Sequence, residues 1–215
     1  PLTEEHPSLQ VYVRGLLEEG RRKSLEPMVR RQGGSGAEYQ SLQQFIADSP
    51  WDPSLLVRAC VERVAPLVGV EAWVVDDTGF PKQGRRSPGV KRQYSGMLGG
   101  TGNCQVGVSV HVAGRHGTVP AGWRLYLPED WCGDQERRAL AKIPDHVVFQ
   151  TKPEIATDLV EQIAGWQLPR APVLADPAYG RDVMFRERLH AAELEYLVAV
   201  STEIAVYPEQ TRFEV

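Results

Sequence analysis

Residues 72–82 read AWVVDDTGFPK, and residues 172–182 read PVLADPAYGRD. Each stretch begins as a short apolar run and stops at carboxylates: Asp76 and Asp77 in the first, Asp176 in the second. Such runs predict buried strands. Acidic side chains at the ends of neighbouring strands of an α/β sheet can reach one divalent cation. An Asp at a strand end is also a common turn residue, and for Asp76 we favour a hydrogen bond to the following turn.

The sequence around these two stretches predicts further strands and helices. Apolar residues alternate with a period of two in two segments and form a short continuous run in a third, whereas two later segments have helical spacing. The predicted strands are 72–75, 103–113, 123–127, 172–175 and 196–200, and the predicted helices are 153–166 and 182–192, with a polar connector and short helix over 128–143. The order β-β-β-α-β-α-β predicts an α/β fold in which helices cover a mixed sheet.

Residues 1–70 predict a separate helical unit, and residues 71–215 predict the α/β core. Apolar spacing indicates three helices, the last of which begins at Pro53 with Asp52 as its N-cap. The basic residues of this unit, Arg21, Arg22, Lys23, Arg30 and Arg31, leave two interpretations open. Either the helices pack on the next domain, or they contact DNA directly.

Basic charge is concentrated in one part of a chain whose formal net charge is −4. No Asp or Glu occurs from Thr78 to Pro128, whereas seven Lys and Arg residues do. Five of the seven lie between Lys82 and Arg92 among glycines, which is typical of a loop that faces phosphate groups. The alternative is a strand-rich region whose few charges happen to be basic. The candidate DNA-binding residues are Lys82, Arg85, Arg86, Lys91, Arg92 and Tyr94.

Composition excludes several other classes of protein. The 215 residues are 42% hydrophobic and 24% charged, as in ordinary globular proteins. Because no apolar run approaches about 18 residues and no signal peptide is recognised, we expect a cytoplasmic protein without membrane contact. Cys60, Cys104 and Cys132 are odd in number and far apart, which argues against a disulfide framework or a zinc site. No GxSxG motif or histidine spacing indicates a hydrolase triad.

Four segments together resemble the DDE transposases of bacterial insertion sequences, also described as DDE superfamily endonucleases. They are VVDDTGFPKQGRRSPGVKRQYSGMLGGTGNCQVGVSVHV (74–112), LYLPEDW (125–131), LADPAYGRDVMFRERL (174–189) and YLVAVS (196–201). The helical segments YVRGLLEEGRRKSLEPM (12–28) and SLQQFIADSPWD (41–52) are also similar to that family. The resemblance implies a ribonuclease H-like fold and cleavage and transfer of DNA strands.

The resemblance also implies a site and its partners. Asp77 and Asp176 match the family's first two catalytic, metal-binding acids, and the implied cofactor is Mg²⁺ or Mn²⁺. The implied partners are double-stranded DNA, at the ends of the element and in the target, and a second copy of the chain in a homodimer on DNA. The family has its third acid, a Glu, on a helix beyond the last strand, and no residue here matches it. Glu203, Glu209 and Glu214 follow that strand without helical periodicity, so none is assigned this role.

Pro177 departs from the family pattern, which more usually has a small residue after the second Asp. Proline biases the preceding residue toward an extended backbone, so it can re-aim the Asp176 carboxylate. Three functions therefore stay open. The first is a transposase core, cut off before the third acid. The second is a non-catalytic, transposase-derived protein that binds DNA or regulates. The third is an interaction module that uses an exposed sheet edge.

Overall fold

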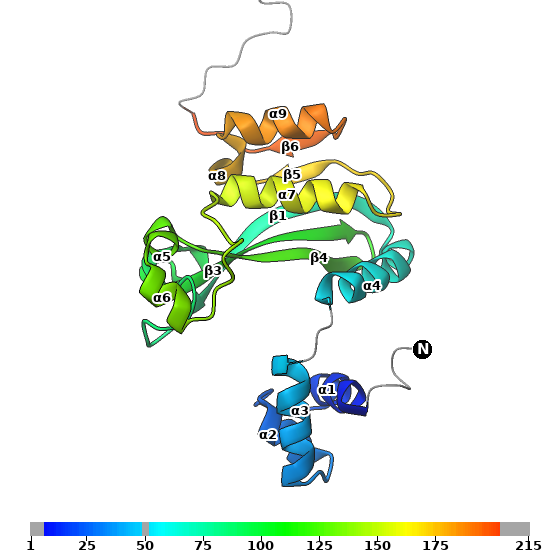
Figure 1. Cartoon of the computed structure of the whole chain (residues 1–215). Coiled ribbons are helices and arrows are strands. Elements are labelled where there is room, and N and C mark those ends of the chain that lie inside the picture. Colours follow the sequence, from blue (N-terminus) through cyan, green and yellow to red (C-terminus); the bar gives the residue numbers. More distant parts are fainter. Residues whose placement is uncertain (1–6, 49–51, 203–215) are drawn as a thin grey trace, which may run out of the picture. The chain divides into compact units, whose positions relative to one another are not determined.

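The computed structural model describes residues 7–48 and 52–202 of the chain, which forms two compact units, residues 1–53 and 54–215. The first unit contains α1 (Pro7–Leu17), α2 (Leu25–Arg31) and α3 (Gly36–Asp48) (Figure 1). Helix α2 was not predicted. Before it, the Lys23 ammonium donates to the Leu16 carbonyl at the end of α1, at 2.8 Å. This basic residue therefore satisfies carbonyls at a helix terminus within its own unit.

Helix α4 (Pro53–Val68) begins at the proline that the sequence indicated. It does not belong with the first three helices. Val61 and Ala65 of α4 are buried in the same apolar cluster as Trp73 of the sheet. The boundary between the units accordingly lies at Pro53, not at residue 70, because the apolar face of α4 packs on the core of the second unit.

The described part of the second unit has one mixed sheet of six strands, which confirms the expected α/β, ribonuclease H-like architecture. In space the main strands follow the order β4-β3-β1-β5-β6. Strand β3 is antiparallel to β1 and β4, whereas β5 and β6 continue parallel to β1. Strand β2, which was not predicted, pairs with the first residues of β3. The strands are β1 (Val70–Pro81), β2 (Lys91–Ser95), β3 (Gly100–Gly114), β4 (Gly117–Tyr126), β5 (Val173–Ala175) and β6 (Tyr196–Val198).

Strand β1 continues past the carboxylates at which it was expected to stop. Residues 78–81 pair with β3 as far as Cys104. Here β1 approaches β2 so closely that a Cβ atom on Gly79 would collide with the Ser95 side chain. Because β5 pairs with β1 only as far as Val75, the two acids lie inside β1 but just beyond the end of its neighbour.

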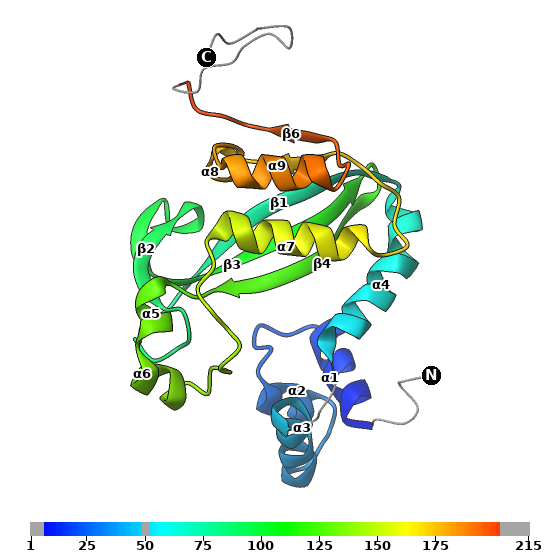
Figure 2. The same cartoon turned by 45° about the horizontal axis from the view of Figure 1, so that its top comes forward.

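Helices cover one face of the sheet next to these acids. Helix α7 (Lys152–Ala164) lies along β3 and β4 in both Figure 1 and Figure 2, and its side chains Ile155, Leu159 and Ile163 are buried there. Helix α9 (Val183–Ala191) lies beside α7. The remaining helical segments are short: η1 (Gly96–Leu98), α5 (Glu129–Gly133), α6 (Gln135–Leu140) and α8 (Pro177–Gly180).

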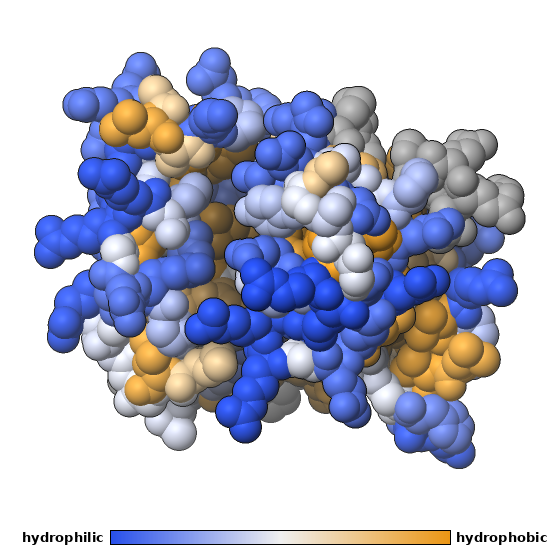
Figure 3. All heavy atoms as spheres, turned by 90° about the horizontal axis from the view of Figure 1, so that it is seen from below, coloured by the Kyte–Doolittle hydropathy of each residue, from blue (hydrophilic) through white to orange (hydrophobic). Residues whose placement is uncertain are grey.

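Hydrophilic residues cover most of the face of the molecule in Figure 3 and separate smaller hydrophobic patches. Within residues 7–48 and 52–202, no helix is long and apolar enough to cross a membrane. Cys60, Cys104 and Cys132 are free thiols.

Candidate metal and DNA site

Asp77 lies on the face of β1 that is covered by α7. Trp73 and Val75 are buried on this face, and the period of two along a strand places Asp77 on the same side. Its Oδ2 accepts a hydrogen bond from Lys152 Nζ at 2.9 Å and from the Tyr179 hydroxyl at 3.4 Å. The Asp77 carboxylate is thus half-buried and held by groups from α7 and α8.

Asp176 follows β5 directly and caps α8. Its backbone is extended, with φ −76° and ψ 176°, as expected for a residue before proline. Its Oδ1 accepts a hydrogen bond from the Ala178 backbone N–H at 2.8 Å, and Pro177 occupies the first helical position. A short cap therefore fixes the direction in which this exposed carboxylate points.

The two carboxylates meet around Tyr179. Val75 and Ala175 form the last pair between the parallel strands β1 and β5, and Asp176 follows Ala175 directly, whereas Asp77 is the second residue after Val75, so both acids lie just beyond the end of this pairing. Burial, followed by the charges of Asp77, Asp176 and Asp76, raises the pKa of the Tyr179 hydroxyl well above its ordinary value. This hydroxyl therefore stays protonated and acts as the donor in its hydrogen bond to the Asp77 carboxylate. Gly180 lets α8 approach β6, because a Cβ atom there would collide with the Ala199 carbonyl.

Asp77 and Asp176 suit a hard cation such as Mg²⁺ or Mn²⁺, which prefers carboxylate oxygens. Among the described residues, Asp77 Oδ1 and Asp176 Oδ2 receive no hydrogen bond, so each carboxylate keeps an oxygen for a ligand bond. Within residues 7–48 and 52–202, no group of three or more His, Cys, Asp or Glu residues forms a metal cluster. Two acids alone would supply only part of the coordination shell of such an ion, and water or phosphate oxygens would have to complete it. Glu203, Glu209 and Glu214 lie outside the described residues.

Asp76 is placed differently from Asp77. Its carboxylate is on the opposite face of β1, is exposed, and accepts a hydrogen bond from the Asp77 backbone N–H at 2.7 Å. The prediction that Asp76 bonds the backbone that follows it agrees with this contact, although the backbone there is strand rather than turn.

A basic hollow lies beyond the end of β1. Its volume is about 450 Å³, and five cations line it together with one acid, Asp130. Asn103 holds its wall by donating to the carbonyls of Lys82 and Gly84, at 2.6 and 3.0 Å. Four of the cations were predicted as DNA-binding residues, and the fifth was not. The five are Lys82, Arg85, Lys91, Arg92 and Arg137.

The fifth cation, Arg137, comes from α6. Its guanidinium stacks 3.5 Å above the centroid of the buried Trp131 ring and donates to the Arg85 carbonyl at 3.0 Å. Trp131 in turn donates to the Val90 carbonyl at 2.8 Å. This stacking fixes the guanidinium plane at the hollow.

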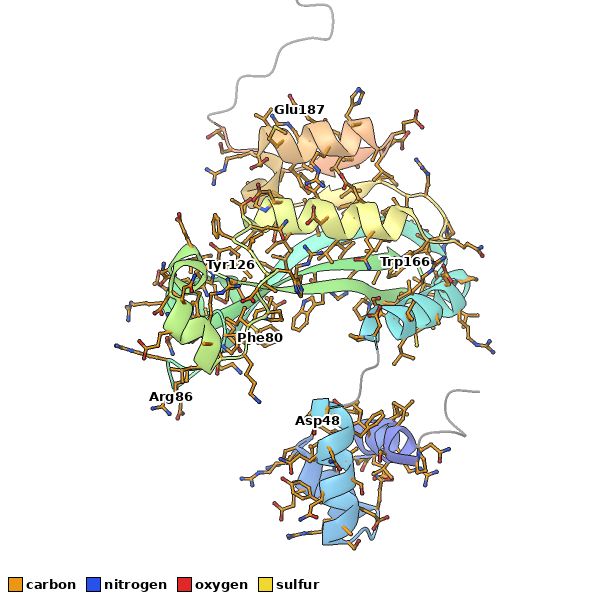
Figure 4. The ribbon with its side chains drawn as sticks, in the orientation of Figure 1. Asp48, Phe80, Arg86, Tyr126, Trp166 and Glu187 are labelled. Atoms are coloured by element: carbon orange, nitrogen blue, oxygen red, sulfur yellow. The ribbon has the colours of Figure 1, made fainter. Side chains whose placement is uncertain are left out.

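The other basic residues of the acid-free stretch are not at the hollow. Arg86 is exposed and points away from the body of the protein in Figure 4. Arg115 pairs with Glu71 at 3.3 Å, and Arg124 pairs with Asp158 at 3.0 Å. Tyr94, a predicted DNA contact, is 67% exposed on β2 and does not line the hollow. The structure thus separates the cations of the hollow from Arg115 and Arg124, which form ion pairs within the second unit.

Two residues at the acids were not singled out by the sequence. Tyr179 lies in the quoted stretch PVLADPAYGRD but carried no chemical signal of its own. Lys152 reaches Asp77 from a distant part of the chain, and the only local signal is a lysine at the start of a helix, where cations are unfavourable.

This fold, with two carboxylates at the junction of β1 and β5, agrees with the comparison to known families. The family described as DDE superfamily endonuclease matches residues 2–214, and the chain belongs to it. The chain is also 29% identical over 203 residues to the probable transposase for insertion sequence element IS701 of Microchaete diplosiphon. That match covers 91% of this chain but 50% of the relative, so the chain spans about half the length of the curated protein it matches.

Proposed function

We propose that this chain is the nuclease core of an insertion-sequence transposase, with Asp77 and Asp176 as its catalytic metal ligands. The observation that carries the proposal is the position of these two acids on either side of Tyr179, each with one carboxylate oxygen that receives no hydrogen bond from the described residues. Nucleases of the DDE superfamily use divalent metal ions in general. We propose Mg²⁺ or Mn²⁺ for this site because both acids are hard oxygen donors.

The residues around the acids hold them for this task. Tyr179 donates to Asp77 Oδ2, and the α8 cap holds Asp176 Oδ1, so both side chains are restrained before any ligand binds. Such restraint lowers the cost of arranging the site. A bound divalent ion would supply Lewis acidity toward a phosphodiester and a more nucleophilic water.

We propose that the basic hollow binds the DNA backbone. Lys82 is five residues beyond Asp77 along an extended strand, which corresponds to about 17 Å between their Cα atoms. At a rise of about 3.4 Å per base pair, this spans about five base pairs of duplex. One duplex can therefore contact the acids and the hollow together. Because strand transfer joins two ends of an element to a target, we further propose that two copies of the chain act as a homodimer on DNA.

Nicking of supercoiled plasmid tests the proposal. We expect the purified chain to nick plasmid in Mn²⁺ or Mg²⁺ at low salt, and we expect Asp77→Asn and Asp176→Asn to abolish nicking. Asp145→Asn is a matched control, because Asp145 is an exposed acid that does not line either candidate region. Salt-dependent DNA binding that is indifferent to the metal and to Asp77→Asn, without nicking, would instead favour a non-catalytic DNA-binding protein.

A further inference from the structure

Lys152 lies at the N-terminal end of α7, where the helix dipole is unfavourable for a cation. It is the first residue of α7, directly after the N-cap Thr151. The positive end of the helix dipole repels an ammonium group there. The start of the helix is nevertheless well fixed, because Thr151 and Glu154 form a capping box in which Glu154 accepts from the Thr151 backbone N–H at 2.7 Å. A lysine at the positive end of a well-fixed helix indicates that a contact with another part of the chain compensates for the unfavourable helix dipole.

That contact is with the candidate metal ligand. Lys152 Nζ lies 2.9 Å from Asp77 Oδ2, and the two side chains are only 29% and 19% exposed. The ammonium also lies 5.9 Å from the centroid of the Tyr126 ring, whose face attracts cations. Figure 4 shows Tyr126 at the end of the sheet where α7 begins. The Lys152 ammonium therefore has two favourable neighbours, the Asp77 carboxylate and the face of the Tyr126 ring.

A divalent ion and the Lys152 ammonium would compete for Asp77. Both are cations, and both are attracted to the same carboxylate, so each weakens the binding of the other. The conflict is removed if a phosphate group arrives with the ion, because its non-bridging oxygens accept hydrogen bonds from an ammonium. With the metal ion alone, the Lys152 ammonium is repelled by the ion; with the phosphate bound as well, the ammonium gains a hydrogen-bond acceptor at the same position.

We propose that Lys152 is a phosphate-binding residue of this nuclease site. It neutralises Asp77 in the metal-free chain and donates to a non-bridging oxygen of the phosphodiester when the metal and DNA bind. This inference rests on the proposed function and deepens it, since it assigns a substrate contact to a residue outside the acidic set.

Manganese binding without DNA distinguishes this role from that of a structural ion pair. If Lys152 competes with the ion, Lys152→Gln binds Mn²⁺ about three- to tenfold more tightly than the unaltered chain. If the pair only positions Asp77, the same substitution leaves Mn²⁺ affinity unchanged or lowers it. The measurement is the electron paramagnetic resonance signal of free Mn²⁺ during titration. The matched control is Lys142→Gln. Lys142 is exposed, and this substitution removes the same charge without removing a contact to Asp77.

Nicking at saturating Mn²⁺ is the second readout. We expect Lys152→Gln to nick plasmid at least about tenfold more slowly despite its tighter metal binding, and we expect Lys152→Arg to recover part of the rate because it keeps the charge. Circular dichroism verifies that the variants fold. Unchanged or weaker Mn²⁺ binding, or an unchanged nicking rate, would overturn the inference while leaving the metal site intact. If Asp77→Asn does not weaken Mn²⁺ binding, the proposed metal site fails, and the role of Lys152 fails with it.

Discussion

Asp176 caps α8 and is also a proposed metal ligand, and two substitutions separate these roles. Its Oδ1 caps α8 through a 2.8 Å bond from the Ala178 backbone N–H, while Oδ2 is the proposed metal ligand. Asn caps a helix about as well as Asp, whereas Ala does not cap, and loss of a cap costs about 1 kcal/mol. For a unit of roughly 150 residues, this lowers Tm by about 2–4 °C. We therefore expect Asp176→Ala to lose that stability and Asp176→Asn to lose only a few tenths of a kcal/mol.

Metal binding, unlike stability, should fall equally in the two variants. Both variants lack the carboxylate charge, so both should bind Mn²⁺ at least about tenfold more weakly. Thermal unfolding followed by near-ultraviolet circular dichroism reports on the second unit, because Trp73 and Trp131 are fully buried there. Full Mn²⁺ affinity in Asp176→Asn, or a loss of stability as large as in Asp176→Ala, would contradict these two roles of Asp176.

Two further predictions follow from the surface charges. Replacing Arg85 and Arg92 with Gln should weaken DNA binding and reduce the slope of log K against log salt by about 1.8, whereas Arg115→Gln should leave it unchanged; fluorescence anisotropy between 50 and 200 mM salt tests this. At Asp158, burial raises the pKa, but hydrogen bonds from a glutamine and two arginines outweigh it, so that the pKa is lowered. Because this pKa is lower in the folded chain, its stabilisation is present above the ordinary aspartate pKa and is lost as the pH falls through the lowered value. Asp158→Asn should therefore cost about 1–2 kcal/mol at pH 7 and much less once the pH is below the lowered pKa, as measured by urea unfolding.

The order of strands and helices in the core could be predicted from the sequence because most elements have a clear period of their own. Strand β3 alternates apolar and polar residues, and α7 has an apolar face with Pro153 near its start. Strand β2 could not be predicted, because KRQYS has no apolar pattern and forms a strand only by pairing with β3. Local preference is overridden there by tertiary pairing.

Two boundaries were misplaced for related reasons. TGFP after Asp77 has the composition of a turn, yet β3 extends alongside it and supplies partners for a strand. Helix α4 has the same periodicity as the helices before it, and only its buried neighbours, such as Trp73, assign it to the second unit.

The acids of the candidate site follow from local sequence, but their neighbours do not. The apolar run 72–75 ends at the pair Asp76 and Asp77, and the run 172–175 ends at Asp176, which are local signals; the family resemblance selects Asp77 from the pair. Lys152 and Arg137 have no such signal, because each gains its meaning from a contact with a residue far away in the chain. Sequence periodicity describes which face a residue occupies, but not which side chain from another element lies opposite.

Asp77 and Asp176 are proposed to bind one divalent ion where β1 passes the end of β5. Fe²⁺ bound in place of Mg²⁺ generates hydroxyl radicals with ascorbate and peroxide, and these radicals cut the polypeptide beside the ion. We predict two cuts, near residues 76–78 and near residues 175–177, both suppressed by excess Mg²⁺ and both absent in Asp77→Asn. Cuts confined to other regions, or the same two cuts persisting in Asp77→Asn, would contradict the claim.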